Sequence, residues 1–91
     1  MLKFEWDQEK AARNVVKHGV SIDEAVSVFG DTLALTFADT DHSELEGRSR
    51  TYGMSNKSRL LVVVHTERRN NVRIISARKA TRYEKSIYQN G

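Results

Sequence analysis

Seven side chains of this sequence are of the types that acid–base chemistry at a phosphodiester requires. They are His42, Glu46, Arg48, His65, Glu67, Arg73 and Arg78. Cleavage of RNA without a metal ion needs a group that takes the proton of the 2′-hydroxyl, cations that hold the negative transition state, and a group that protonates the leaving oxygen. Imidazole, carboxylate and guanidinium groups can fill these roles. The expected products are a 2′,3′-cyclic phosphate and a 5′-hydroxyl.

Structural roles stay open for several members of this set. His65 follows three valines in an expected strand, so its ring could instead pack at the rim of the sheet with one nitrogen bonded to the backbone. Glu46 and Glu67 could be ion-pair partners that hold neighbouring arginines in place. Arg78 could be a solvated strand end. The choice between catalytic and structural roles therefore depends on which side chains share a face.

Other kinds of site find little support in the sequence. The chain has no Cys, which excludes disulfides, thiolate metal sites and thiol nucleophiles. No glycine-rich nucleotide loop, zinc-protease helix or nucleophile elbow is present. His42 and Glu46 lie near Asp39 and Asp41, but a solvated acidic loop explains this cluster better than a metal. We expect no metal and no cofactor.

Charge divides the chain into two halves of opposite sign. Residues 1–47 contain four Lys or Arg and ten Asp or Glu, a net charge of −6, whereas residues 48–91 contain eleven and two, a net charge of +9. Most of these cations are arginines, which form forked contacts to phosphate. The basic half could also neutralise the acidic half or face solvent. The sorting of charge favours a nucleic-acid partner, and we expect contacts to RNA from Lys17, His42, Arg50, Lys79 and Arg82.

The length of 91 residues predicts one domain over residues 1–91. No apolar run approaches the roughly 20 residues that cross a bilayer, and charges interrupt residues 1–5 where a signal peptide would be apolar. We therefore expect a cytoplasmic protein without a membrane partner.

Local sequence patterns predict the helices and strands that carry these side chains. Alternation over residues 2–6 predicts a strand, and Asp7 can cap a helix to His18 whose apolar stripe is residues 11, 12, 15 and 16. Ser21 begins a capping box and a second, shorter helix that ends near Gly30. Thr81 can cap a last helix, anchored by Tyr83 and Tyr88.

The second half reads mainly as strands. We expect strands at residues 33–37, 48–54, 60–64 and 72–78, with the apolar run 60–64 in the middle of the sheet and a turn at residues 70–71. Strict alternation puts Arg73, Ile75 and Ala77 on one face of the last strand and Ile74, Ser76 and Arg78 on the other.

The resulting order β-α-α-β-β-β-β-α predicts an α+β fold of two layers. Two N-terminal helices cover one face of a mostly antiparallel sheet, and the other face stays partly open. Because the arginines of residues 48–54 and 72–78 border that open face, we expect them to contribute to anion binding more than to folding.

Motifs across nearly the entire chain resemble those of the BrnT toxins. The matching positions are residues 4–7, Lys10, Asn14, residues 17–20, Glu24, Ala25, Phe29, Asp41, His42, Glu46, Arg48, residues 61–67, residues 73–81, Glu84 and Tyr88. The most specific of them are Lys17-His18-Gly19 and the segment 74–81. The chain departs from the family's pattern at residues 68–71, where relatives are expected to have a turn containing glycine, so we expect the hairpin here to differ in shape.

The resemblance implies a type II toxin with a RelE-like ribonuclease fold that cleaves RNA, halts translation and is neutralised by a BrnA-like antitoxin. Operator DNA would be bound only through that antitoxin. The polar positions of the family fall on Lys10, Asn14, Lys17, His18, His42, Glu46, Arg48, Arg73 and Arg78.

Two functional hypotheses follow. In the first, the protein is a metal-independent endoribonuclease in which Arg48, Arg73 and Arg78 hold the scissile phosphate and His65 or Glu46 transfers protons. In the second, it is an inactive nucleic-acid-binding or interaction module of a complex that represses its own operon, because a fold alone does not guarantee an activity.

Overall fold

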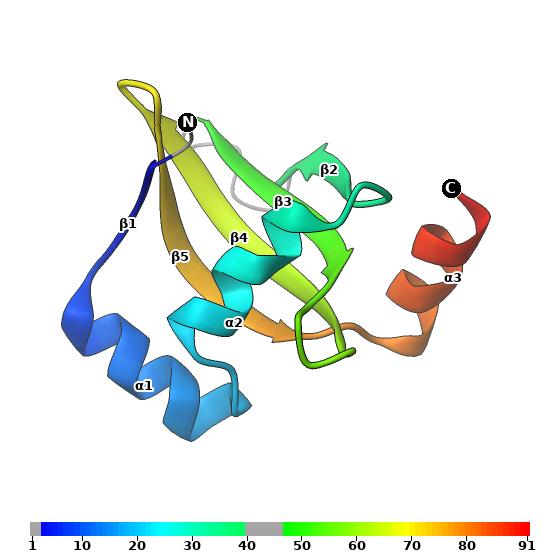
Figure 1. The fold of residues 1–91 in the computed structure, drawn as a ribbon, viewed down its shortest axis with the longest axis horizontal. Helices are drawn as coiled ribbons and strands as arrows, with labels where there is room; N and C mark the ends of the chain where they lie inside the picture. The colour runs from blue at the N-terminus through cyan, green and yellow to red at the C-terminus, as the bar shows by residue number, and fades with distance from the viewer. Residues whose placement is uncertain (1–2, 40–46) are drawn as a thin grey trace.

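The computed structural model describes residues 3–39 and 47–91 (Figure 1). Within these ranges the elements are β1 (Lys3–Trp6), α1 (Gln8–His18), α2 (Ile22–Ser27), the 3-10 turn η1 (Val28–Gly30), β2 (Leu35–Ala38), β3 (Arg48–Met54), β4 (Leu60–Arg68), β5 (Asn71–Lys79) and α3 (Arg82–Asn90). The strands form one sheet in the order β1-β5-β4-β3-β2, in which β1 runs parallel to β5 and the other neighbours are antiparallel. The predicted α+β class and element order are confirmed.

Side-chain caps set where the helices begin. The carboxylate of Asp7 accepts a hydrogen bond from the backbone of Lys10, and the hydroxyl of Ser21 accepts one from Glu24. Thr81 and Glu84 form a reciprocal capping box at the start of α3. These caps satisfy backbone N–H groups that the first turn of a helix leaves without partners, so they determine the residue at which each helix begins.

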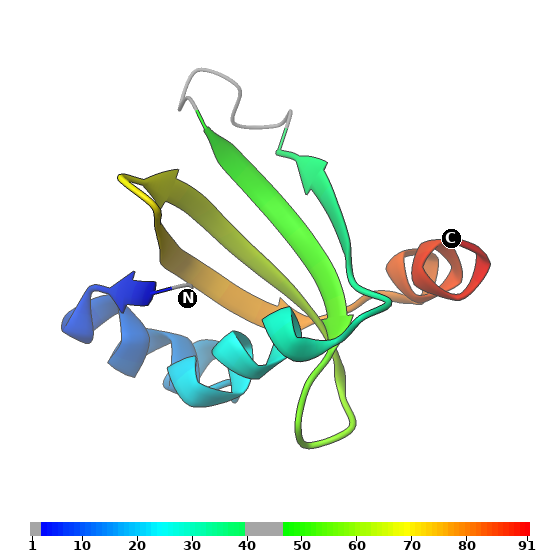
Figure 2. The same cartoon turned by 45° about the horizontal axis from the view of Figure 1, so that its top comes forward.

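Helices α1 and α2 lie on one side of the sheet, and α3 lies at its far end beyond β3 (Figure 2). The core between the two layers is built from Val20, Ala25 and Val28 on the helical side. From the strands it takes Leu61, Val63, Val72, Ile74 and Ala77. Strand β4 is central, and Val62 and Val63 are fully buried, as the apolar run predicted.

The apolar stripe predicted for α1 does not enter the core. Val16 is 89% exposed, and the buried residue of the helix is Asn14. Its amide nitrogen donates to the carbonyls of Val20 and Ala77 at 2.9 Å each, and its amide oxygen accepts from the Ala77 N–H at 3.2 Å. Since β1 pairs with β5 only as far as Ile74, the Asn14 amide replaces a strand as partner for the next part of β5.

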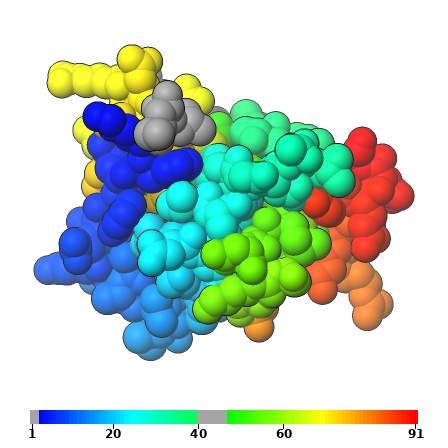
Figure 3. Space-filling model, viewed as in Figure 1, coloured from blue at the N-terminus to red at the C-terminus, as the bar shows by residue number. Residues whose placement is uncertain are grey.

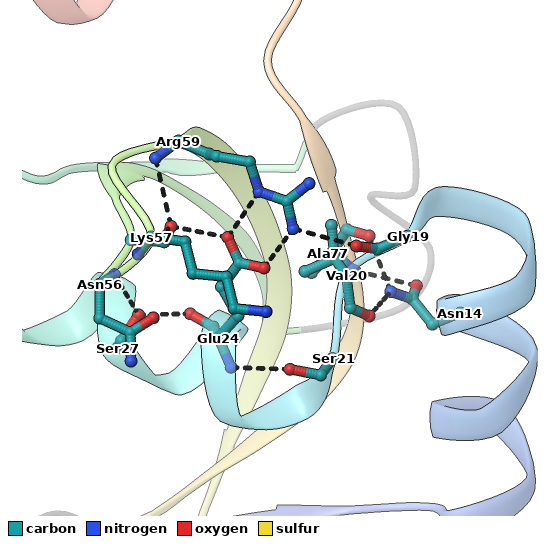
Figure 4. Close-up of polar contacts among 11 residues, drawn as sticks. Asn14, Gly19, Val20, Ser21, Glu24, Ser27, Asn56, Lys57, Arg59 and Ala77 are labelled. Carbon is teal, nitrogen blue, oxygen red and sulfur yellow. Dashed lines mark hydrogen bonds and ion pairs between the residues drawn. The ribbon is translucent and has the colours of Figure 1, made fainter.

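A second buried polar link joins α2 to the turn between β3 and β4 (Figure 4), two segments that lie side by side at the surface (Figure 3). The Glu24 carboxylate, 1% exposed, accepts from the Ser55 hydroxyl at 2.7 Å and from Arg59 Nε at 2.8 Å. A second nitrogen of Arg59 bonds the other carboxylate oxygen and the Gly19 carbonyl. The Arg59 guanidinium holds the pKa of Glu24 below its usual range. Arg59 is therefore occupied by a structural partner and does not belong to the free cations of the basic half.

The structure places several strand boundaries differently from the sequence prediction, and β4, expected at residues 60–64, extends to Arg68. The hairpin turn between β4 and β5 is at Arg69 and Asn70, not at residues 70–71, and both residues have positive φ angles of 50° and 73°. Positive φ at both central residues is the geometry of a two-residue hairpin turn, here formed without glycine. The strand expected at residues 33–37 begins only at Leu35, and Leu33 is 70% exposed.

A bulge in β5 overturns the predicted alternation of that strand. The pairing with β4 steps from His65↔Ile74 to Val64↔Ser76, so Ile75 is an extra residue without a counterpart. Both Ile74 and Ala77 consequently face the core, although strict alternation put them on opposite faces. By the same shift, Arg73 and Arg78 both face away from the core.

Candidate active site

The face of the sheet opposite α1 and α2 gathers four arginines from β3 and β5. Register fixes their order, because residues directly opposite each other in an antiparallel pair point to the same side. Arg48 and Arg73 both lie opposite Thr66 of β4. Arg50 lies opposite Val64, and Arg78 lies opposite Val62, which is itself opposite Tyr52 of β3. Together Arg48, Arg50, Arg73 and Arg78 form what we call the arginine face.

Arg48 and Arg50 have donors that find no acceptor among residues 3–39 and 47–91. Both side chains are half-buried, and the Nε atom of each is buried without a hydrogen-bond acceptor within the described ranges. Arg50 lies 3.8 Å from Oδ1 of Asp39, which is an ion-pair distance but too long for a hydrogen bond. Buried donors without acceptors are uncommon and costly, so these guanidinium groups are suited to donate hydrogen bonds to an anionic ligand.

Arg73 has a weak partner. One of its terminal nitrogens is 3.4 Å from Oε1 of Glu5, and Arg68 approaches the same oxygen at 3.8 Å. Glu5 is 36% exposed, and exposed ion pairs contribute little, so a phosphate can compete with it for Arg73. The hollow beside this pair has a volume of about 440 Å³ and is lined by Glu5, Arg68, Arg69 and Asn71.

Arg78 has a strong partner in Glu84 of α3. Two parallel hydrogen bonds join the groups, at 2.7 and 2.9 Å, and the backbone N–H of Thr81 donates to the same carboxylate at 2.8 Å. The Arg78 guanidinium lowers the pKa of Glu84 to about 2, despite the burial that opposes ionisation. Glu84 in turn raises the pKa of Arg78. Arg78 therefore fixes the start of α3 as well as bordering the arginine face.

A hollow of about 420 Å³ separates α3 from β2 and β3. It is lined by Phe37, Ala38, Arg50, Tyr52, Thr81, Tyr83, Glu84 and Ile87. Tyr83, predicted to anchor α3, is 73% exposed at this hollow. Tyr88 does anchor the helix, because its hydroxyl donates to Asp31 at 2.6 Å. The hollow adds apolar surface to one end of the arginine face.

His65 lies on the other side of the sheet from the arginine face. Its Nε2 is hydrogen-bonded to the Thr51 hydroxyl at 2.7 Å, and its ring meets Phe29 edge-on with centroids 5.0 Å apart. The side chain is 5% exposed, and burial lowers its pKa. Among the described residues its Nδ1 has no hydrogen-bond partner. The structure thus separates His65 from the arginines with which it was grouped.

The remaining sequence candidates fall in different places. Glu67 is exposed near the end of β4 and lies opposite Val72, a core residue, so it is not on the arginine face. Lys79 lies at the exposed end of β5, and Arg82 is the exposed first residue of α3. Lys17 lies on α1, beside the free edge of β5. His42 and Glu46 lie outside the described residues.

Glu84 is the site-forming residue that sequence reasoning did not single out. The spacing Thr81-x-x-Glu84 is a capping-box signal and could have marked it as a buried carboxylate at a helix start. No signal in the sequence indicated its pairing with Arg78. Within the described ranges, His, Asp and Glu side chains do not gather in threes as a metal ion would require, and no helix is long and apolar enough to span a membrane.

Comparisons with known proteins identify the family and agree with the fold. A family model described as the ribonuclease toxin BrnT of type II toxin–antitoxin systems matches residues 6–84. The crystal structure of the Brucella abortus ribonuclease toxin BrnT is similar with a TM-score of 0.72 and 25% sequence identity, over 90% of this chain and 100% of that one. No curated protein sequence matches the chain.

Proposed function

Because the chain belongs to the BrnT family, the ribonuclease toxins of type II toxin–antitoxin systems, we propose that it cleaves RNA on the arginine face without a metal ion. The family resemblance and the toxin function inferred from sequence motifs are confirmed. The observation that carries the proposed mechanism is the β5 bulge, which brings Arg73 and Arg78 to the same face as Arg48. Cleavage of RNA in this way would inhibit translation.

In this mechanism the arginines bind the scissile phosphate. When the 2′-hydroxyl oxygen attacks phosphorus, negative charge grows on the non-bridging oxygens, and fixed guanidinium donors stabilise that charge more than they stabilise the ground state. Arg48 and Arg73 flank Thr66 from the two neighbouring strands, so they can approach one phosphate from two sides. Arg78 contributes at the α3 end of the face.

Proton transfer needs a group near these arginines. We assign to Glu46, which precedes Arg48 by two residues in the chain, the removal of the 2′-hydroxyl proton; as the new 2′-oxygen–phosphorus bond forms, the bond to the 5′-oxygen breaks, and this oxygen takes a proton from water. Glu84 is unsuited to donate a proton at neutral pH because Arg78 keeps its carboxyl ionised, with a pKa of about 2. His65 takes no part in this mechanism, since the sheet separates it from the phosphate.

As a type II toxin the protein has an antitoxin partner. We propose that this partner is BrnA-like and covers the arginine face together with the hollow beside α3, so that it excludes RNA by sterics and by charge. Operator DNA would then be bound through the antitoxin alone, and the complex would act in the cytoplasm. RNA and antitoxin should therefore compete for one surface.

The test is RNA cleavage by the purified protein in excess EDTA, with analysis of the product ends. We expect cleavage with 2′,3′-cyclic phosphate ends, and a loss of about a hundredfold in rate for Arg48→Ala or Arg73→Ala with an unchanged melting temperature. Lys57→Ala, an exposed cation in the β3–β4 turn, is the matched control.

Two results would contradict the proposal. Activity that disappears in EDTA and returns with a divalent ion would show a metal-dependent reaction. RNA binding without cleavage, and no growth arrest on expression without antitoxin, would instead support the inactive binding module.

A further inference from the structure

The cations of α1 are confined to one side of the helix. Lys10, Arg13 and Lys17 are spaced three and four residues apart, which places them on one stripe. The hollow on the other side of α1 has Trp6 and Val15 among its lining residues and contains no cation within the described ranges. This stripe belongs to the half of the sequence with a net charge of −6, so the sequence total conceals a basic surface that forms when the chain folds.

The stripe borders a hollow at the free edge of the sheet. The hollow has a volume of about 300 Å³, with Lys10, Arg13, Lys17 and His18 on the α1 side and Ile75 and Ser76 on the β5 side. Strand β1 stops pairing at Ile74, and Asn14 bonds to Ala77, so Ile75 and Ser76 lie between these two partners of the β5 edge. The same bulge that shapes the arginine face therefore also forms one wall of this hollow.

The hollow and the arginine face form one continuous surface. Ser76 lies opposite Val64, which lies opposite Arg50, so Ser76 is in the same row of the open face as Arg50. Along β5, Arg73 and Arg78 stand on either side of Ser76 and face the same way. A chain of phosphates on the arginine face can thus continue over Ser76 to the α1 stripe without crossing an acidic residue of the hollow's lining.

The charges of the stripe are available to a ligand. Lys10, Arg13 and Lys17 form no ion pair with any other residue that the structure describes, in contrast to Arg59 and Arg78. All three side chains are exposed. Lys10 and Lys17 are about 10 Å apart along the helix, which separates them enough to contact different phosphates.

We propose that the α1–β5 hollow is a second phosphate-binding site, which holds the backbone of the RNA strand on one side of the cut. The proposal rests on the proposed function, since it extends the path of the same RNA. It predicts that affinity depends on the length of the RNA, because only an RNA that reaches past the arginine face can occupy the hollow. The contacts are to phosphates, so the site reads no base sequence.

The test measures the affinity for an RNA that cannot be cut. A fully 2′-O-methylated RNA of roughly 12 nucleotides lacks the attacking hydroxyl, so the wild-type chain can be used. The test variant is Lys10→Gln with Lys17→Gln, and the matched control is Lys57→Gln with Lys85→Gln, which removes the same charge from exposed positions elsewhere. Circular dichroism and melting verify that both fold, and cleavage by the wild type is measured separately as the test of the proposed function.

The test variant is expected to bind the long RNA roughly tenfold more weakly, with the slope of log affinity against log salt reduced by about 1.4, the contribution of two phosphates on a single strand. The control should lose less than about twofold, and a trinucleotide should bind both variants alike. Equal losses in test and control would overturn the proposal, because net charge alone would then explain them. Unchanged RNA affinity with weakened antitoxin affinity would also overturn it and assign the hollow to the antitoxin.

Discussion

Replacing Arg78 by Ala is expected to destabilise the folded protein, because it leaves the Glu84 carboxylate buried without its guanidinium partner. Glu84 is 6% exposed, and its two hydrogen bonds to Arg78 are 2.7 and 2.9 Å long. Removing one member of a buried pair costs more than the pair contributes, since the remaining charge stays desolvated. The expectation from sequence, that an arginine of the open face matters mainly for binding, therefore holds less well for Arg78 than for Arg48.

The structure sets the size of this effect. A carboxyl pKa that falls from 4.5 to about 2 corresponds to about 3 kcal/mol of preference for the charged form. Arg78 is the largest cause, but the Thr81 N–H bond survives the substitution. The Arg78 side chain is also 35% exposed, so solvent screens part of the interaction. We therefore expect a loss of about 2 kcal/mol in the free energy of unfolding.

A double-mutant cycle with Glu84→Gln measures the coupling directly. Urea unfolding at about pH 7 should give a coupling of about 1 to 2 kcal/mol between the two positions. Arg82→Ala, which removes an exposed arginine four residues further along, should change stability by less than about 0.5 kcal/mol. A coupling below about 0.5 kcal/mol would place this pair with ordinary surface ion pairs and refute the reasoning.

Acid should remove the same contribution. Because the folded-state pKa of Glu84 is depressed, its stabilisation is complete above about pH 4.5 and declines as the pH falls towards 2. The difference in unfolding free energy between wild type and Glu84→Gln should therefore be constant from pH 7 to 5 and shrink below that. A difference that stays constant down to about pH 2.5 would contradict the assigned pKa.

Three further substitutions test other parts of the structure. In urea unfolding, Asn14→Ala should lower the free energy of unfolding by about 3 kcal/mol, because it leaves buried backbone groups of β5 without partners. Val16→Ala, on the exposed side of the same helix, should change this free energy by less than about 0.5 kcal/mol. Gly53→Ala should cost about 1 to 3 kcal/mol, since its Cβ would lie 2.6 Å from a Val28 methyl, and it should cost less in a Val28→Ala background. Burial lowers the pKa of His65, so wild type should lose stability relative to His65→Gln as the pH falls below about 6.5, and a nuclear magnetic resonance titration of the ring that shows a normal or raised pKa would contradict this.

Local signals were enough to predict most of the fold. Asp7, Ser21 and Thr81 cap the helices because a short polar side chain satisfies the first free backbone donors wherever the sequence offers it. The apolar run at β4 predicted the central strand for an equally local reason, since burial on both faces requires it. These features depend on neighbours in the chain and are therefore visible in the sequence.

The candidate site depends on contacts between distant residues, and here sequence reasoning was less complete. Asn14 and Ala77 are 63 positions apart, so no local pattern could reveal that an amide replaces a strand at the β5 edge. His65 was grouped with the arginines because all are chemically suited to one reaction, but the side of the sheet that each occupies depends on strand register. The pairing of Arg78 with Glu84 likewise follows from where α3 begins relative to β5.

The extra residue in β5 also decides how the strand would respond to losing one residue. Without Ile75, regular alternation would pair Ile74 with His65 and Ser76 with Val64 as before, so Ile74 and Ala77 would stay in the core and Arg73 and Arg78 would stay on the arginine face. What would disappear is the bulge itself, together with the part of the α1–β5 hollow that Ile75 lines. Deletion of this one residue therefore separates the hollow from the arginine face, which no substitution on the surface of α1 can do.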